Sequence, residues 1–107
     1  MAIDDIHWHD SLVLSVRIVP EKDTVEMRLL YPEEWRKNSF AERTVIFEEA
    51  YGYKEFEGPI YGSPTILSAQ IAGSEGDCKL MRLETNAGYR ELFCKDVFLV
   101  EPKMRNR

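Results

Sequence analysis

Two consecutive runs of alternating apolar and polar residues constrain the fold of this chain more than any other feature. Residues 12–19 and 24–31 each repeat with a period of two, and Pro20–Asp23 between them has the composition of a turn. The two runs therefore predict an antiparallel hairpin in which Val19 lies opposite Thr24. The further predicted pairs are Ile18 with Val25, Arg17 with Glu26, Val16 with Met27 and Leu14 with Leu29.

Shorter apolar runs predict further strands at 43–47 and 65–71, and a second hairpin closes the chain. In that hairpin the loop 86–88 connects 79–85 to a run beginning at Tyr89. A three-residue loop places Thr85 opposite Tyr89 and Leu80 opposite Cys94. The alternation reverses near Lys95 and Asp96, which predicts either a bulge or the join between two strands.

Three segments are predicted to lie outside the strands. Pro32 should end the second strand, so 33–38 is expected to be a loop with at most one helical turn. Residues 73–77 have the composition of a turn. Residues 48–64 mix glycine and proline with tyrosine, phenylalanine and glutamate, which predicts a long irregular loop of the kind that often carries function.

These elements predict an all-β fold, or a mainly β fold with at most one short helix. We expect six to seven strands in a strongly bent antiparallel sheet, closed as a small barrel or a sandwich. The length of 107 residues supports a single β-rich domain over 1–107. The basic tail at 103–107 is expected to be frayed and solubilising.

Charge and cysteine content narrow the function classes. Fourteen basic against nineteen acidic residues give a net charge of −5, which disfavours nucleic-acid binding and favours a basic protein partner. The chain shows no signal-like start and no apolar run long enough for a membrane, so we expect a cytoplasmic protein. Cys78 and Cys94 are then expected to be free thiols.

The densest polar cluster surrounds the only two histidines of the chain, His7 and His9. In an extended segment these two side chains would share a face and could bind one metal ion, whereas Asp10 would point the other way, so a third metal ligand would have to come from elsewhere. His7, His9 and Asp10 together are the candidate ligand cluster. The alternative is a hydrogen-bonded turn at His9–Ser11 with Trp8 buried against the sheet.

No pattern in the sequence indicates catalysis or a bound cofactor. Ser11, His9 and Asp10 supply the residue types of a triad, but neighbouring side chains of a strand alternate in direction, and no nucleophile elbow is present. We therefore expect a protein that is not an enzyme and that carries no cofactor.

The aromatic and acidic middle of the chain is the stronger candidate for binding a partner. Tyrosine and tryptophan are favoured in interfaces, and acidic neighbours would steer a basic partner. The alternative is that the aromatic residues only cover the open end of a small core. The candidate partner-binding residues are Trp35, Glu48, Glu49, Tyr51, Tyr53, Glu55, Phe56 and Tyr61.

The motif His9-Asp10-Ser11, followed by an alternating strand, a turn and Val25-x-Met27-x-Leu29, resembles the start of many small bacterial proteins. Some of these are similar to β-rich immunity proteins of polymorphic toxin systems, in which a later strand resembles Val45-Ile46-Phe47. The resemblance covers about the first half of the chain and the final hairpin. It implies a cytoplasmic, non-enzymatic protein that binds and neutralises a toxin, and it assigns no individual site residues.

Three hypotheses follow. The leading one is a protein-binding domain that uses the acidic, aromatic segment. The alternative is a small-molecule or metal-dependent function at His7 and His9. The third is a homodimer formed by paired sheet edges, because exposed edges in a small β protein need protection.

Overall fold

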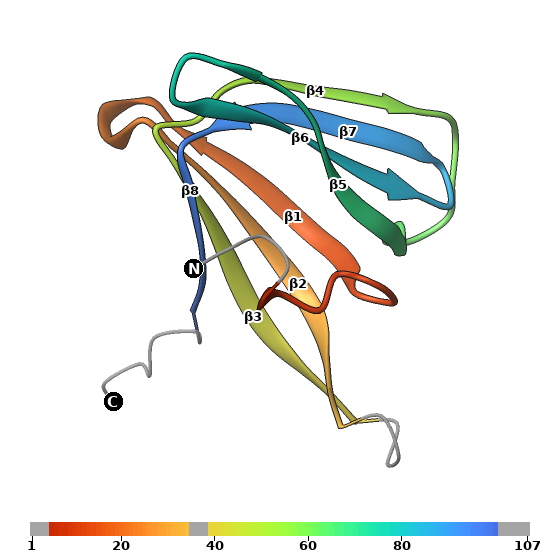
Figure 1. The fold of residues 1–107 in the computed structure, drawn as a ribbon. Helices are drawn as coiled ribbons and strands as arrows, with labels where there is room; N and C mark the ends of the chain where they lie inside the picture. Colours follow the sequence, from red (N-terminus) through yellow and green to blue (C-terminus); the bar gives the residue numbers. More distant parts are fainter. Residues whose placement is uncertain (1–4, 35–38, 101–107) are drawn as a thin grey trace.

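The structure is a computed structural model that describes residues 5–34 and 39–100. Eight strands form two four-stranded antiparallel sheets, in the orders β1-β2-β3-β8 and β4-β7-β6-β5 (Figure 1). The expected all-β antiparallel fold is confirmed, although the expected number of six to seven strands is too low. The strands are β1 Leu12–Val19, β2 Thr24–Glu34, β3 Ser39–Glu48, β4 Tyr51–Glu57, β5 Ile66–Glu75, β6 Cys78–Thr85, β7 Gly88–Cys94 and β8 Asp96–Val100.

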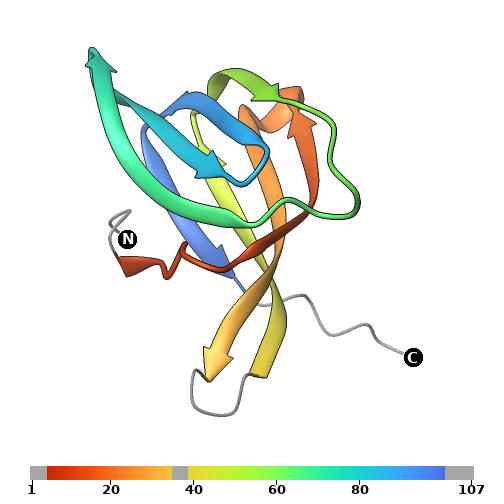
Figure 2. The same cartoon turned by 90° about the vertical axis from the view of Figure 1, so that its right-hand side faces the viewer.

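The two sheets pack as layers with their apolar faces turned toward each other (Figure 2). Met27, Leu29, Val45 and Phe47 of the first sheet are fully buried. They form one core with apolar side chains of the second sheet, of which Leu83 is one. The alternation that predicted the strands thus corresponds to one buried face per sheet.

The first hairpin has the predicted register over most of its length. Val19 pairs with Thr24 and Val16 with Met27, and a single turn of 3-10 helix at Pro20–Lys22 connects the strands. The predicted pairing of Leu14 with Leu29 is wrong, because the register shifts between Val13 and Ser15 and places Val13 opposite Leu29. A bulge inserts one unpaired residue, which a strict period of two does not anticipate.

The predicted break at Pro32 is also wrong, because β2 continues to Glu34 and Pro32 pairs with Phe40 of β3. The pairing of β2 with β1 ends at Leu30. Beyond that residue β2 has a strand on one side only, so the missing N–H of a proline is tolerated there.

The second predicted loop, 48–64, contains strand β4, which was the strand missing from the expected number. A register shift between Tyr51 and Lys54 interrupts the pairing of β4 with β7, and Gly52 has a positive φ of 68° at this shift. This bulge hides the period of two from a sequence pattern. The irregular segment is limited to 58–65.

The closing hairpin is one residue out of the predicted register. Thr85 pairs with Gly88 across a two-residue turn, and Leu80 pairs with Phe93 rather than with Cys94. The predicted turn at 73–77 is shorter than expected, since β5 continues to Glu75.

The reversal at Lys95 is the predicted join between two strands: β7 belongs to one sheet and β8 to the other. The Lys95 backbone N–H donates to the Glu48 carbonyl at 2.9 Å, which ties this crossing to the end of β3. The described part of the chain has no helix that is long and apolar enough to cross a membrane.

Gly88 provides a test of the β4–β7 contact. Its φ is 148°, and a Cβ at this position would overlap the carbonyl oxygen of Phe56 and press on Glu57. We expect Gly88→Ala to lower the free energy of unfolding by about 2 kcal/mol or more, measured by urea denaturation. Gly58→Ala is the matched control, since a Cβ at Gly58 meets nothing within 4 Å. Equal stability losses in the two variants would contradict the proposed contact.

Candidate functional site

Strand β4 directs its side chains to both faces of the second sheet. Tyr51 and Phe56 lie on the outer face, where they stack on residues of β7. Tyr53, Glu55 and Glu57 lie on the inner face, where they contact Arg90. The segment that sequence analysis treated as one loop is therefore divided into an outward and an inward set.

The outer set forms what we call the aromatic face: Tyr51, Phe56, Tyr89 and Phe93. Tyr51 stacks on Phe93 with ring centroids 5.0 Å apart, and Phe56 stacks on Tyr89 at 4.8 Å. Tyr51 is 44% exposed and Phe56 46% exposed. Two half-exposed aromatic pairs thus lie on the solvent side of the sheet, with the cross-strand pair Lys54 and Glu91 between them.

Polar groups fix both pairs in place. The guanidinium of Arg82 lies 4.7 Å from the centre of the Tyr89 ring and is ion-paired with Glu91, so it adds a cation–π contact to one pair. The hydroxyl of Tyr51 donates to Glu75 of β5, and this hydrogen bond, with burial and the carboxylate charge, raises the pKa of Tyr51 to about 12. The face is therefore ordered before any partner binds.

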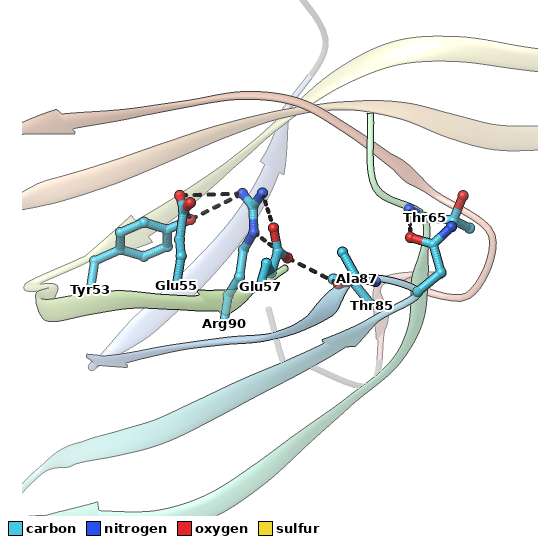
Figure 3. A network of polar contacts seen from close by, with 8 residues as sticks. Tyr53, Glu55, Glu57, Thr65, Thr85, Ala87 and Arg90 are labelled. Carbon is cyan, nitrogen blue, oxygen red and sulfur yellow. Dashed lines mark hydrogen bonds and ion pairs between the residues drawn. The ribbon is translucent and has the colours of Figure 1, made fainter. Parts of the chain in front are cut away.

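The inner set is a polar network centred on Arg90 (Figure 3). The Arg90 side chain is only 8% exposed, and it donates from Nε and Nη2 to the two carboxylate oxygens of Glu57, both at 2.8 Å. The hydroxyl of Thr85 donates to Glu57 at 2.9 Å, and Nη1 of Arg90 donates to the Tyr53 hydroxyl at 3.0 Å. The Tyr53 hydroxyl in turn donates to Glu55 at 2.7 Å.

Burial and the Arg90–Glu57 interaction shift the pKa values of these two residues in opposite directions. The hydrogen bond from Arg90 holds the pKa of Glu57 below its ordinary value, although burial opposes that shift. Burial would lower the pKa of Arg90, but the hydrogen bonds to Glu57 and the neighbouring charges outweigh it, so the net shift is upward. Burial, followed by the hydrogen bond to Glu55, raises the pKa of Tyr53. At neutral pH the network is an ion pair with a neutral tyrosine beside it.

This network gives two of the predicted partner-binding residues, Tyr53 and Glu55, a structural role instead. Tyr53 is half-buried and holds Arg90, while Glu55 remains exposed but lies 3.6 Å from Arg90 in an ion pair. A buried and bidentate arginine pair fixes one packing arrangement rather than offering free groups to a ligand. We therefore exclude Tyr53 from the aromatic face.

The other predicted residues are scattered. Glu48 is exposed and pairs in register with Asp96, and Glu49 is ion-paired with Lys95 at 3.7 Å in the turn before β4. Tyr61 is fully exposed in the loop after β4. Trp35 lies outside the described residues.

Sequence analysis missed Tyr89, Phe93 and Arg82 as site residues. Tyr89 and Phe93 alternate with the buried Arg90 and Leu92, so their outward direction follows once β7 is recognised as a strand. Their stacking on β4 requires the pairing of the two strands and the bulge at Gly52, and no local pattern contains that information.

The histidine cluster has a different geometry from the one that the metal hypothesis requires. His9 and Asp10 lie in a turn, with Asp10 at a φ of 73°, so the extended conformation assumed for the segment is wrong. His9 is exposed and its Nδ1 lies 3.2 Å from Asp10, whereas His7 is half-buried and packs edge-on against Tyr31. Within residues 5–34 and 39–100, no three His, Cys, Asp or Glu side chains are grouped so that they could hold a metal ion.

The alternative interpretation of this segment is confirmed. The backbone N–H of Ser11 donates to the Trp8 carbonyl at 3.1 Å, and the Ser11 hydroxyl donates to the His7 carbonyl at 3.0 Å. Trp8 is buried and stacks on Phe47 with ring centroids 6.2 Å apart. The His-Asp-Ser motif therefore forms a turn that closes one end of the core.

Comparisons of the chain with protein-family models, curated proteins and solved structures gave no match. The site is therefore interpreted from its own geometry.

The Arg90–Glu57 pair predicts how stability depends on pH. Because the pKa of Glu57 is lowered on folding, its contribution is complete above the ordinary glutamate pKa and is lost as the pH falls through the folded value. We expect Glu57→Gln to lower the free energy of unfolding at pH 7 by about 3 kcal/mol, with a smaller loss toward pH 3. Urea denaturation across this range is the measurement.

The control for that experiment is Glu42→Gln, which removes the exposed ion pair with Arg28 and should leave stability nearly unchanged. A Glu57→Gln variant that loses stability with acid as steeply as the wild type would contradict the assignment.

The two thiols should differ in reactivity. Both cysteines are free, Cys94 is buried and Cys78 is half-buried, and burial is the main cause that raises the pKa of Cys94 to about 12. We expect a thiol-specific reagent at pH 8 to modify Cys78 first, with Cys94 reacting only after unfolding. Rapid modification of Cys94 in the folded Cys78→Ser variant would contradict this burial.

Proposed function

We propose that the chain is a non-enzymatic protein-binding domain that engages its partner through the aromatic face. The observation that carries this proposal is the pair of stacked rings, Tyr51 on Phe93 and Phe56 on Tyr89, half-exposed on the outer face of the second sheet. Aromatic side chains with polar handles are the residues that contribute most to binding energy in protein interfaces.

The order of this face supports the proposal. Each ring already lies against another ring, and Arg82 of β6 and Glu75 of β5 each hold one of the two pairs. A partner that covers these rings would pay little conformational entropy on binding, because the side chains are already immobilised. An ordered aromatic surface on a sheet suits a flat protein surface better than a small molecule, which prefers a concave site.

The charge of the chain supports a basic partner. Its net charge is −5. Glu48 and Glu49 are exposed at the end of β3 and in the turn before Tyr51, and the exposed Glu75 accepts a hydrogen bond from the Tyr51 hydroxyl. Complementary charge accelerates the encounter of two proteins more than it strengthens the final complex.

A narrower form of this proposal is an immunity protein that binds and neutralises a toxin. The resemblance of the His9-Asp10-Ser11 opening to such proteins supports it, as does the fit between an acidic surface and a basic toxin domain. Free thiols at Cys78 and Cys94 suit action in the cytoplasm. Protection of cells that also produce a candidate toxin tests this form directly.

A binding experiment tests the general proposal. After capture of the partner on the tagged protein, we expect Phe56→Ala and Tyr89→Ala each to weaken the affinity at least about tenfold, since truncating a central interface aromatic costs ~2 kcal/mol or more. Calorimetry or surface plasmon resonance measures this change. The control is Ile18→Ala on the first sheet, where an apolar side chain is 58% exposed.

The charge contribution has a separate prediction. Reversing Glu48 and Glu49 to lysine should slow association and weaken its dependence on salt, with a smaller effect on dissociation.

If Phe56→Ala and Tyr89→Ala leave the affinity unchanged while Ile18→Ala lowers it, the partner binds the first sheet and the proposal is wrong.

A further inference from the structure

Strand β5 is an open edge of the second sheet. It pairs with β6 on one side only, and its first residue, Ile66, bonds on the other side to the backbone of Asp10 and Ser11. From Leu67 onward, no strand in the described part of the chain pairs with that side. Figure 2 shows β5 along the margin of the sheet, with the β5–β6 turn projecting from the body of the domain.

The sequence of this edge lacks the usual protection. Residues 66–74 contain no charged side chain and no proline. Natural edge strands carry lysine or other charged residues, or proline, and these residues prevent pairing with another chain. The apolar side chains of Leu67 and Ile71 on this strand are each 46% exposed. The edge therefore offers unpaired backbone groups together with apolar side chains.

The other three edges differ. Strand β4 carries Lys54, Glu55 and Glu57, and β8 has five residues that begin with Asp96. Strand β1 contains Arg17, and its first residues are covered by the segment at Pro64 and Thr65. Among the edges that the structure describes, β5 is the one that carries no charged side chain before its last residue, Glu75.

We propose that β5 pairs in an antiparallel manner with β5 of a second copy of this chain. Two copies that each carry a charge of −5 repel each other over most of their surfaces, and the uncharged edge is where that repulsion is weakest. A basic partner strand would find no carboxylate to bind between Ile66 and Ser74. The edge is thus complementary to itself and not to the basic partner proposed for the aromatic face.

The register of β5 limits where the two-fold axis lies. Register shifts occur between Ile66 and Ser68 and again between Ile71 and Gly73, which leaves Ser68–Ile71 as the regular stretch. Residues opposite each other in an antiparallel pair must lie on the same face, so the two-fold axis passes through a residue rather than between two residues. Ala69 and Gln70 are the two central residues of the regular stretch, so the axis is placed at one of them. With the axis at Gln70 the two Gln70 side chains are directly opposite each other, and with the axis at Ala69 they are diagonal neighbours. In both arrangements each Glu75 is distant from Glu75 of the other copy.

This pairing would extend the core across both copies. Ala69 packs against the core, and Ile71 lies opposite the buried Met81, so Ile71 of each copy would be covered by the other. The two second sheets would become one continuous sheet, with both aromatic faces on the same side. The inference does not depend on the proposed function, because the β5 edge and the aromatic face use different groups.

Sedimentation equilibrium over a range of concentrations tests the inference on the full chain. We expect a mass of twice 12.5 kDa for the wild type. Gln70→Lys and Gln70→Glu, each alone, should raise the dissociation constant of the dimer at least about tenfold, because each places like charges against each other at the axis. An equimolar mixture of the two variants should restore the dimer, since opposite charges then meet.

The matched control is Ile18→Lys, which adds the same charge to another edge strand and should leave the dimer intact. Three results would overturn the inference: a wild type that stays monomeric at millimolar concentration, a Gln70→Lys variant that dimerises as tightly as the wild type, or folded variants whose mixture stays monomeric. Partner binding through the aromatic face is measured separately. If the wild type is monomeric but binds its partner through the aromatic face, only the dimer inference is rejected. If the wild type dimerises through β5 but the aromatic-face variants bind the partner normally, only the proposed function is rejected.

Discussion

The packing of two apolar sheet faces against each other is the constraint on which the rest of the structure depends. Phe47 and Met27 from one sheet and Leu83 and Leu92 from the other are completely buried, and burial of such side chains is the main favourable contribution to folding. One chain must supply both faces, so it crosses from the first sheet to the second between β3 and β4 and returns at Lys95. There the direction of the buried side chains reverses, and β8 joins the first sheet beside β3.

Strand β4 contributes to stability through one face and to the proposed recognition through the other. Its inward residues hold the buried Arg90 in a bidentate ion pair with Glu57, which satisfies a charge that would otherwise be costly to bury. Its outward residues stack on β7 and remain half-exposed. The inner network holds β4 against β7, and this contact positions the aromatic rings on the outside. A change on either face of β4 is therefore expected to affect the other.

The second sheet carries both proposed interaction surfaces, and each has a distinct physical character. The aromatic face has large, ordered rings beside carboxylates, which suits a basic protein surface. The β5 edge offers backbone hydrogen bonds and no charged side chain before Glu75, which suits its own copy. Pairing through β5 would place the two aromatic faces on the same side of one continuous sheet, separated by β6 and β5 of each copy. A partner with two matching surfaces at that spacing would bind with increased avidity.

The sequence alone determined the strand-rich fold, the register of the first hairpin from Val16 to Val19, and the join at Lys95, because a period of two is a local property of the chain. It left β4 unrecognised, since the bulge at Gly52 interrupts that period, and it placed the closing hairpin one residue out of register. Only the tertiary structure decided which aromatic residues meet, that Tyr53 and Glu57 turn inward to Arg90, and that His9 lies exposed in a turn while His7 packs against Tyr31. These outcomes depend on which strands become neighbours, and that choice is made by burial of the whole core rather than by any short segment.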